Sequence, residues 1–588
     1  MPDAGDVALA CCMLLVDELV RGGARHACMT AGSRSTPLVL AVARNPAITL
    51  HVHVDERSSS YYALGIAKAS GAPAIALCSS GTAAANHFPA VVEASMAREP
   101  LIVLTADRPP ELHGVGANQA IDQQRLFGDF VRLFADAGVP DDEATATRRW
   151  RALGARAVAA ALGDGRSTDA RWPPPGPVHI NMPFREPLVP SGQRVPLHAD
   201  SDAAVVAEDV VPWTERSVSA DDVGRAASLI GAAERVVVVA GTLHGDGACI
   251  LDMAQRHAWP VLAEPTSLVR CAPEALSAGE LLVIDDGFRT AHRADVVLQL
   301  GAAPTSRAMQ SFVREAGALV IIDPDDVVGD PERRATVRIV ADARRALRAL
   351  DGAIGGRGSD EWMRSWRAAD AAARAGVDAL LDSWDEPFEG RIAGDLASAL
   401  PSDGTLVVAS SMPVRDLTMF MAPGDGVTPR VLANRGASGI DGTVSTALGV
   451  AAVSPSTYAL IGDLALLHDA SALLWSAGRD HHAVIVVVDN DGGGIFSLLS
   501  QAQHLEAEEL ERLFTTPHGA ALDIAALARA SGAGYREVTS AAAVIPALRD
   551  AQRAHGVELV HVRVDRSRAR AMRDAVRACV RDALQRAD

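Results

Sequence analysis

Two side chains that can offer oxygen ligands, Asp463 and Asn490, stand in the sequence with 26 residues between them, and Gly492, Gly493 and Gly494 follow. Magnesium prefers six oxygen ligands and is commonly held by one or two protein groups together with phosphate oxygens. Asp463, Asn490, a backbone carbonyl near Gly492, two diphosphate oxygens and a water would complete such a set. The glycines would let the backbone approach the phosphates closely. The spacing therefore predicts a site for a divalent cation and a diphosphate group.

The elements around these residues must bring them to neighbouring strand ends. An apolar run at Tyr458–Ile461 ends just before Asp463, a helical pattern extends from Leu464 to about Gly478, and a second apolar run at Ala483–Asp489 leads to Asn490. A right-handed crossover returns the chain to the same edge of a parallel sheet, so we expect the two side chains to emerge side by side. The alternative is two ordinary strand-end turns capped by Asp and Asn. A dinucleotide site is disfavoured because no G-x-G-x-x-G motif follows a first strand.

A carboxylate that could exchange a proton, Glu56, lies between a strand-like run and an Ala-rich helical stretch. A lone Glu in this position is usually a solvated residue at a helix start, where the helix macrodipole favours it. The turn Ser79-Ser80-Gly81-Thr82 follows another strand of the same region and could cradle a ligand beside it. A carboxylate buried in such a position is suited to proton exchange.

Strand-like apolar runs alternate with Ala-rich helical stretches along the chain, a pattern typical of an α/β protein with parallel sheets. A length of 588 residues allows three to four domains at roughly 150 residues each. A polar stretch at 189–213 and a helical passage at 341–379 divide the runs, so we expect three α/β domains at 1–190, 214–352 and 380–588. The predicted strands are His26–Thr30, Leu50–Val54, Ala74–Ser79, Leu101–Ala106, Val178–Met182, Arg235–Ala240, Val296–Leu300, Leu319–Asp323, Thr405–Ser410, Tyr458–Ile461, Ala483–Asp489 and Glu558–Val564.

Composition excludes several classes of function. A formal net charge of −18 argues against nucleic acid and anionic membranes as partners. No apolar run reaches the length of about 18 residues that a membrane helix needs, and the acidic N-terminal segment is typical of a first helix rather than a secretory signal. Seven scattered cysteines fit a reducing cytoplasm. Lys68 is the only lysine, which disfavours enzymes that depend on a Schiff base.

Longer motifs carry a resemblance to a known family. In the first third they are Gly32-Ser33-Arg34-Ser35-Thr36-Pro37, Asp55-Glu56-Arg57, Ser80-Gly81-Thr82-Ala83 with Asn86, Leu104-Thr105-Ala106-Asp107-Arg108-Pro109-Pro110-Glu111-Leu112 and Gly116-Ala117-Asn118-Gln119. In the last third they are Ser411 to Arg415, Asn434-Arg435-Gly436-Ala437-Ser438-Gly439-Ile440-Asp441-Gly442, Gly462-Asp463-Leu464, and Asn490 with Gly492-Gly493-Gly494-Ile495-Phe496. With these motifs the chain resembles the thiamine-diphosphate-dependent 2-succinyl-5-enolpyruvyl-6-hydroxy-3-cyclohexene-1-carboxylate synthases of menaquinone biosynthesis. The Gly-Asp and Asn signal is common to thiamine-diphosphate enzymes, whereas the longer motifs are typical of this synthase.

The resemblance implies a thiamine-diphosphate-binding fold of three domains, each a mostly parallel sheet flanked by helices. The first domain would bind the pyrimidine, the last would bind the diphosphate with Mg²⁺ or Mn²⁺, and the central one would bind no cofactor. The enzyme would be a homodimer or homotetramer in which one chain's first domain faces its partner's last domain. It would decarboxylate 2-oxoglutarate and add the resulting succinic semialdehyde carbanion to isochorismate.

The resemblance also assigns residues to roles. Glu56 would be the catalytic carboxylate, and Asp463, Asn490 and Gly492 the metal ligands. The cofactor would further contact Ser80, Gly81, Thr82, Asn86, Ile440, Gly462, Leu464, Gly493, Ile495, Phe496 and Leu499. Substrate carboxylates would meet Ser33, Arg34, Arg108, Asn118, Gln119, Arg307, Ser411, Arg415 and Arg435, since the planar guanidinium suits a carboxylate.

Two features depart from the family pattern. Met29-Thr30-Ala31 precedes Gly32 where other residues, often ending in Pro, are more usual, and Ser306 stands where some relatives have Lys. Alternatives remain open: another thiamine-diphosphate 2-oxo acid decarboxylase, an acetolactate synthase-like enzyme, or an inactive α/β binding or scaffold protein. The loosely glycine-rich Gly241-x-x-x-Gly245-x-Gly247 could indicate an FAD site in the central domain.

Overall fold

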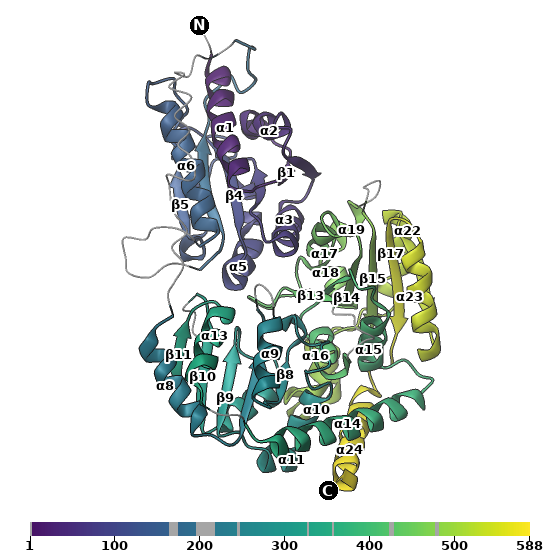
Figure 1. Cartoon of the computed structure of the whole chain (residues 1–588). Helices are drawn as coiled ribbons and strands as arrows, with labels where there is room; N and C mark the ends of the chain where they lie inside the picture. Colours follow the sequence, from purple (N-terminus) through teal and green to yellow (C-terminus); the bar gives the residue numbers. More distant parts are fainter. Residues whose placement is uncertain are drawn as a thin grey trace. The chain divides into compact units, whose positions relative to one another are not determined.

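The computed structural model contains three parallel β-sheets with helices on their faces (Figure 1). It describes residues 3–163, 174–193, 195, 218–243, 247–325, 329–355, 358–422, 429–476 and 481–587. The described residues form two compact units: one comprises 1–214, 434–455 and 468–481, and the other comprises 215–433, 456–467 and 482–588. The expected three-domain α/β fold with parallel sheets is confirmed, one sheet lying in the first unit and two in the second.

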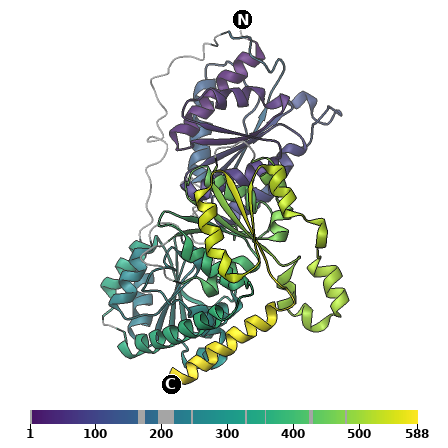
Figure 2. The ribbon, with the colours of Figure 1, turned by 90° about the vertical axis from the view of Figure 1, so that its right-hand side faces the viewer.

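The first sheet has the strand order β2-β1-β3-β4-β6-β5. Alternate residues of its strands, such as Ile102 and Leu104, pack into one core with α1, α2 and α6, while α3 and α5 lie on the other side. Figure 2 shows this sheet between its two helical layers. The strands are β1 (His26–Thr30), β2 (Thr49–His53), β3 (Ala74–Cys78), β4 (Leu101–Asp107), β5 (Leu133–Asp136) and β6 (Val178–Pro183). The helices are α1 (Ala4–Arg21), α2 (Thr36–Ala43), α3 (Glu56–Ser70), α4 (Thr82–Asn86), α5 (Phe88–Ala97) and α6 (Ala146–Ala161).

Two helices from later in the chain, α17 (Thr443–Ala451) and α19 (Ala470–Leu474), belong to this first unit. The helices α3 and α17 approach at two glycines. A Cβ on Gly65 would lie 2.1 Å from the carbonyl oxygen of Thr446, and one on Gly449 would lie 2.0 Å from that of Tyr62. Only glycine permits this distance between the two backbones.

The second sheet has the order β11-β10-β9-β7-β8 and is covered on both faces. Its strands are β7 (Val236–Ala240), β8 (Val261–Ala263), β9 (Val296–Leu300), β10 (Ala318–Asp323) and β11 (Ala335–Val340). The central strands β7 and β10 are almost unbroken apolar runs, as strands buried on both faces should be, whereas the edge strand β11 is only partly buried. The helices are α8 (Ala220–Gly231), α9 (Ala248–Arg256), α10 (Gly279–Ile284), α11 (Asp286–Ala291), α12 (Arg307–Glu315), α13 (Ala343–Ala353) and α14 (Asp360–Asp382).

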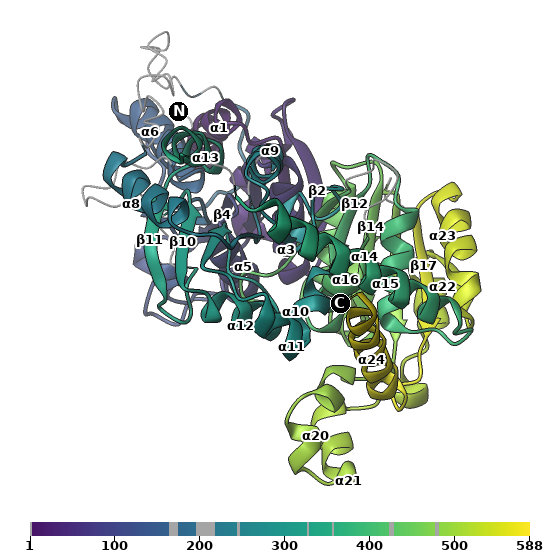
Figure 3. The same ribbon diagram turned by 60° about the horizontal axis from the view of Figure 1, so that its bottom comes forward.

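The third sheet has the order β13-β12-β14-β15-β17-β16. Its strands are β12 (Thr405–Val408), β13 (Arg430–Ala433), β14 (Thr457–Gly462), β15 (Ala483–Asp489), β16 (Gly534–Val538) and β17 (Val557–Arg563). Its helices are α15 (Glu389–Ala399), α16 (Met412–Phe420), α18 (Asp463–His468), α20 (Gln501–His504), α21 (Ala507–Leu510), α22 (Ile524–Ser531), α23 (Val544–Arg553) and α24 (Ala569–Ala587). Figure 3 shows α20 and α21 projecting away from this sheet, and α24 packs along α14.

All twelve predicted strands are present, with ends that differ by no more than two residues. The sequence did not indicate β5, β8, β11, β13 and β16, which are short or only partly buried. The predicted helix from Leu464 to about Gly478 is broken into α18 and α19, and its end lies outside the described residues. In the part of the chain that the structure describes, no helix is both long enough and apolar enough to cross a membrane.

Candidate active site

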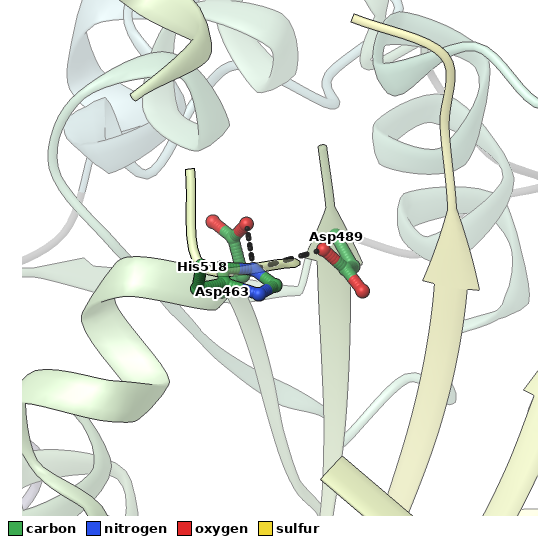
Figure 4. A group of neighbouring side chains, drawn as sticks. All are labelled: Asp463, Asp489 and His518. Carbon is green, nitrogen blue, oxygen red and sulfur yellow. Dashed lines mark hydrogen bonds and ion pairs between the residues drawn. The ribbon is translucent and has the colours of Figure 1, made fainter. Parts of the chain in front are cut away.

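The carboxyl edge of the third sheet brings Asp463 and Asp489 together. Gly462 pairs with Val488 in the parallel ladder, so the residues that follow them leave the sheet side by side. Figure 4 shows the imidazole of His518 between the two carboxylates. His518 Nε2 lies 2.9 Å from Asp463 Oδ2 and 3.3 Å from Asp489 Oδ1. Oxygen and nitrogen atoms of these three residues lie within 4.8 Å of one another and could hold a metal ion.

Asn490 carries a buried oxygen atom that is suited to a bound group. Its Oδ1 is buried and has no hydrogen-bond partner among the described residues. Buried polar atoms in native proteins nearly always have a partner, so this oxygen is suited to a bound group. Asp463, which is 2% exposed, stands at the end of the adjacent strand. Two oxygen donors on neighbouring strand ends fit a magnesium ion held partly by phosphate.

The glycines after Asn490 serve a close backbone approach. Gly492 has φ +120°, and a Cβ there would lie 2.2 Å from the carbonyl oxygen of Thr515. The amide of Gly492 donates to Asp463 Oδ2 over 2.7 Å, and the amide of Gly493 donates to Thr515 over 2.6 Å. The glycine run therefore fixes the Asp463 carboxylate and holds the Thr515–His518 segment against it.

Charges around the edge shift the ionisation of these groups. Burial raises the pKa of Asp463 despite the hydrogen bonds that it accepts. Burial acts in the same direction on Asp489, but the hydrogen bond from His561 Nε2, 2.8 Å long, outweighs it and lowers the pKa of Asp489. Burial opposes protonation of His518, yet its hydrogen bond to Asp463 raises the pKa of the imidazole. Tyr535 lies 2.8 Å from the other ring nitrogen of His561 and completes this network.

The carboxyl edge of the first sheet collects amides, hydroxyls and guanidinium groups instead. The Ser80 hydroxyl donates to the carbonyl of Gln119 over 3.0 Å, and Gln119 Nε2 donates to the carbonyl of Ser80 over 2.8 Å. Arg108 Nη1 donates to Ser80 Oγ over 2.8 Å. A Cβ on Gly32 would lie 2.3 Å from Ser79 Cβ, so the Gly32–Thr36 turn packs against the turn at Ser79 and Ser80. Three motifs that are far apart in the sequence thus meet at one edge.

A buried polar network holds this turn from below. Gln123 Oε1 accepts from the amide of Gly81 over 2.9 Å, and Gln123 Nε2 donates to Asn181 Oδ1 over 2.9 Å. Asn181 Nδ2 in turn donates to Asp107 Oδ2 over 2.8 Å, and Thr105 Oγ1 donates to Asn181 Oδ1 over 3.0 Å. The network ties the ends of β3, β4 and β6 together.

Arg34 and Arg108 make the first-sheet edge electropositive. Arg34 donates to the carbonyl of Phe184 over 2.9 Å and to the exposed Glu186 over 3.2 Å. Burial and the nearby Arg34 guanidinium lower the pKa of Arg108. Arg108 donates to the neutral hydroxyl of Ser80, and the nearby carboxylates of Asp107 and Glu186 only partly offset the lowering of its pKa. Two guanidinium groups, each less than 10% exposed, are therefore suited to receive an anion.

Glu56 lies in the first turn of α3, but it does not cap the helix. Asp55 is the N-cap, and its Oδ1 accepts from the amides of Arg57 and Ser58 over 2.9 and 3.3 Å. Glu56 is half-buried, and no hydrogen bond of its side chain is present among the described residues. Its carboxylate is thus not committed to helix capping and remains available to a ligand.

Several candidate residues adopt unusual backbone angles. Ser411, Gln119 and Asp491 have φ of +71°, +55° and +59°. Non-glycine residues in this region are strained, and such strain is concentrated at functional sites. Ser411 precedes α16, and its carbonyl accepts from Arg415 Nη1 over 2.5 Å. The half-buried Arg415 is therefore oriented by the turn that also contains the strained Ser411.

The remaining predicted residues have less distinctive surroundings. Arg307 is exposed at the start of α12, where Ser306 is the N-cap and its Oγ accepts from the amide of Met309 over 3.1 Å. Gly245, on which the expectation of an FAD site partly rests, lies outside the described residues. Thr82, Asn86, Ser33 and Asn118 are exposed, while Leu464, Ile440, Arg435, Ile495, Phe496 and Leu499 are half-buried.

Sequence reasoning missed several residues at these edges. His518, Asp489 and His561 surround the predicted metal site, and Gln123 and Asn181 support the Ser80 turn. The signal that could have identified Asp489 is its position at the end of a predicted strand, beside Asn490. His518 follows an irregular segment, and its spacing from Asp463 gives no periodic signal.

Comparisons with known proteins agree with this geometry. Residues 12–126 match the N-terminal thiamine pyrophosphate-binding domain of thiamine pyrophosphate enzymes, 207–408 match the middle domain, and 418–562 match the C-terminal thiamine pyrophosphate-binding domain. Three consecutive domains of one enzyme class thus occur in the order of that class, and the two outer ones bind thiamine pyrophosphate, the same compound as thiamine diphosphate.

Relatives that align over nearly the whole chain indicate one kind of synthase within this class of enzymes. A 2-succinyl-5-enolpyruvyl-6-hydroxy-3-cyclohexene-1-carboxylate synthase from Thermobifida fusca is 42% identical, with 97% of this chain and 98% of the relative aligned. Synthases of the same name from Myxococcus xanthus and Chloroflexus aurantiacus are 41% and 40% identical over 94% of this chain. The chain belongs to this family of thiamine pyrophosphate-dependent synthases, so the resemblance drawn from the sequence motifs is confirmed.

Proposed function

We propose that the protein decarboxylates 2-oxoglutarate and adds the resulting four-carbon unit to isochorismate, forming 2-succinyl-5-enolpyruvyl-6-hydroxy-3-cyclohexene-1-carboxylate for menaquinone biosynthesis. The observation that carries this choice of substrates is the buried pair Arg34 and Arg108, which lie close enough to lower the pKa of Arg108. Both substrates are dianions, so two neighbouring guanidinium groups are suited to bind their carboxylates. Pyruvate, the substrate of an acetolactate synthase, carries only one carboxylate.

Thiamine diphosphate is assigned to the two outer domains, with Mg²⁺ or Mn²⁺ held by Asp463, Asn490 and the backbone at Gly492. The fit rests on the buried Asn490 Oδ1 without a partner and on the buried Asp463 carboxylate beside it. The bound cofactor would supply a nucleophilic carbon to add to the keto carbon and a cationic ring to take up the electron pair that departing carbon dioxide leaves. Asp463 and Asn490 would hold the metal ion that links the diphosphate to the third sheet.

The protein's own residues then perform three tasks. Glu56 would exchange a proton with the pyrimidine nitrogen of the cofactor. Asp55 rather than Glu56 caps α3, which leaves the Glu56 carboxylate available for this role. Arg34, Arg108, Gln119, Ser33 and Asn118 bind isochorismate at the first-sheet edge. Arg415, Arg435 and Ser411 bind the carboxylates derived from 2-oxoglutarate, and Arg307 is assigned to the substrate site by family resemblance alone.

The remaining assignments concern packing around the cofactor. Ser80, Gly81, Thr82 and Asn86 form its first-domain cradle. Gly462, Leu464 and Gly493 approach the diphosphate, and Ile440, Ile495, Phe496 and Leu499 form the apolar surface against which the cofactor bends. Phe496 is held by Phe514, whose ring centroid is 5.5 Å away.

The active unit is proposed to be a homodimer, or a tetramer built from such dimers. Exposed apolar side chains support this assignment: Val52 and Val54 lie on or just beyond β2, the edge strand of the first sheet, and Leu474 and Trp475 end α19. Trp475 Nε1 donates to the carbonyl of Val52 over 2.9 Å, so these side chains form one exposed surface. Light scattering of the purified protein tests the assignment.

A coupled assay tests the proposed reaction. Isochorismate and 2-oxoglutarate are supplied with thiamine diphosphate, with and without Mg²⁺, and the product is identified by mass spectrometry. The proposal requires a metal-dependent product that contains both carbon skeletons. Turnover of pyruvate to acetolactate without use of isochorismate would contradict it and would favour the acetolactate synthase-like alternative.

A further inference from the structure

The only lysine of the chain is buried at the end of α3, the helix that begins at Glu56. Lysine and arginine together number 55, so every basic residue except Lys68 is an arginine. Lys68 is 6% exposed. Lysine is almost never buried to this extent unless it is paired, and this sequence otherwise uses arginine for every positive charge. The site therefore calls for a compact ammonium group rather than a planar guanidinium.

Two buried carboxylates of α5 and the residues after it surround the ammonium group. Lys68 Nζ lies 3.5 Å from Glu99 Oε1 and 3.8 Å from Glu93 Oε1. Glu93 is 2% exposed and Glu99 is 9% exposed. A buried carboxylate is costly without a counter-charge, and the ammonium of Lys68 supplies one to Glu93.

Glu93 uses both of its oxygens to hold a distant segment by its backbone. Oε1 accepts from the amide of Gly436 over 2.9 Å, and Oε2 accepts from the amide of Ala437 over 2.7 Å. A Cβ on Gly436 would lie 2.6 Å from the nitrogen of Ala97 and 2.7 Å from the carbonyl oxygen of Glu93. Residue 436 therefore must be glycine for the segment to reach α5 at this distance.

The same segment is fixed at its other end by α3. Tyr61 donates its hydroxyl to Asp441 Oδ2 over 2.6 Å. Gly442 has φ +64°, and a Cβ there would lie 2.0 Å from the Tyr61 ring. At the start, Asn434 Nδ2 donates to Thr446 Oγ1 over 3.0 Å. We call residues 434–442 the anchored loop. It contains Arg435 and Ile440, which were assigned above to substrate and cofactor.

We propose that Lys68 and Glu93 are positioning residues of the active site, which fix the anchored loop through the backbone amides of Gly436 and Ala437. The ammonium of Lys68 lies beside the Glu93 carboxylate, and Glu93 holds two consecutive amides. Arg435 directly precedes the first of them. The consequence for catalysis rests on the proposed function, because it requires Arg435 to bind a substrate carboxylate. The mechanical part of the proposal, that Lys68 and Glu93 fix the anchored loop, does not rest on the proposed function, because it concerns only the position of this loop.

Hydrogen exchange at the two amides tests the mechanical part in the full-length enzyme without substrates. In Glu93→Gln the amide group can accept from only one of the two N–H groups, and its own N–H is turned toward the other. We expect exchange at Gly436 or Ala437 to become about ten- to a hundredfold faster, as the loss of a charge-assisted hydrogen bond implies. Glu99→Gln is the matched control, since it removes the other carboxylate beside Lys68 but touches no loop amide.

Equal exchange at 436–437 in the two variants would overturn the proposal, because it would reduce Glu93 to an ordinary buried partner of Lys68. If Glu93→Gln fails to fold, the variant that combines Lys68→Met with Glu93→Gln replaces the test. Glu99→Gln is added to it, so that the ammonium and both carboxylates are removed together, which buried charges tolerate better than loss of one partner. Faster exchange in the anchored loop is again the expected result, and unchanged exchange contradicts the proposal.

Single-turnover decarboxylation of 2-oxoglutarate tests the catalytic consequence. Glu93→Gln should lower the efficiency of this half-reaction about tenfold, mainly through a higher KM, while Glu99→Gln at equal thermal stability should not. Lys68→Arg should also lower the efficiency of this half-reaction, because the larger guanidinium does not fit the site of the ammonium group. A wild-type enzyme inactive on 2-oxoglutarate would overturn the proposed function but leave the exchange result standing. Fast loop exchange with unchanged KM would overturn the positioning role.

Discussion

In the first and third sheets the strands follow one order, so that β3 corresponds to β14, β4 to β15 and β6 to β17. The correspondence extends to side chains. Asp107 ends β4 and accepts a hydrogen bond from Asn181 of β6, while Asp489 ends β15 and accepts one from His561 of β17. Asn181 pairs with Thr105 and His561 pairs with Val487, each two residues before the Asp.

The two edges differ in the residues that follow the strands. The turn after β3 presents Ser80 and Gly81, whereas the residue after β14 is Asp463; Arg108 follows Asp107, whereas Asn490 follows Asp489. One edge is therefore cationic and suited to carboxylates, and the other is acidic and suited to a metal ion. Both sheets share the strand order and an Asp that is hydrogen-bonded by a residue of β6 or β17. The turns after the strands determine which chemistry each edge can support.

The largest expected loss of activity follows from substitution of Glu56, the proposed proton-exchanging group of the first domain. Glu56→Gln keeps the shape of the side chain but cannot exchange a proton. Turnover should fall by about a hundred- to ten-thousandfold, the contribution typical of general acid–base catalysis. Deuterium exchange at the thiazolium carbon of bound thiamine diphosphate is the measurement. Cofactor affinity should be retained, and a wild-type exchange rate would assign activation to another residue.

The metal ligands of the third-sheet edge should give the next largest effect. Asp463→Ala or Asn490→Ala should weaken binding of thiamine diphosphate with Mg²⁺ by on the order of a hundredfold, since each removes a charged or coordinating contact. Calorimetric titration measures this affinity, and circular dichroism checks that the fold is intact. Arg34→Ala, at the edge of the first sheet, is the control and should bind the cofactor normally, because its hydrogen bonds go to Phe184 and Glu186. Unchanged affinity in both metal-ligand variants would remove this edge from the cofactor site.

The arginines divide the substrates between the two edges. Arg415→Ala should lower use of 2-oxoglutarate by about ten- to a hundredfold even without isochorismate, because a charge-assisted hydrogen bond contributes roughly 1.5–3 kcal/mol. Arg34→Ala should decarboxylate 2-oxoglutarate normally and fail at the second substrate. Single-turnover decarboxylation separates the half-reactions. The reverse pattern would mean that the two sets of arginines have been assigned to the wrong substrates.

The smallest expected effects come from the corresponding supports on β6 and β17. His561→Phe should weaken metal-dependent cofactor binding about tenfold, as loss of an outer support of a metal site typically does. Asn181→Leu should act mainly on the efficiency with isochorismate, since it releases Asp107 and Gln123 beneath the Ser80 turn. Cofactor binding should fall less than in His561→Phe, although Ser80 and Gly81 also belong to the cofactor cradle. Both variants are measured in both assays. If each impaired both activities equally, the supports would act on overall stability rather than on their own edges.

The sequence was sufficient to predict the strands that are long and apolar, because burial on both faces gives them an unbroken hydrophobic run. It did not indicate β13 or β16, which contain Arg430 and the pair Arg536–Glu537 and lie at the edges of the third sheet. Asp463 and Asn490 could be predicted because one crossover links them. His518, Gln123 and Asn181 could not, since contacts between segments so far apart depend on tertiary packing.

Complementation between inactive subunits tests most directly whether the two edges serve one cofactor. Glu56→Gln damages only the first-sheet side and Asp463→Ala only the third-sheet side. If one cofactor is held by the first domain of one chain and the last domain of its partner, mixed dimers contain one site with both halves intact. Mixing the two inactive variants under conditions of subunit exchange should therefore restore measurable synthase activity, up to about half of the wild-type value per mixed dimer. Mixed dimers that form, as seen by mass spectrometry, and remain inactive would contradict the account.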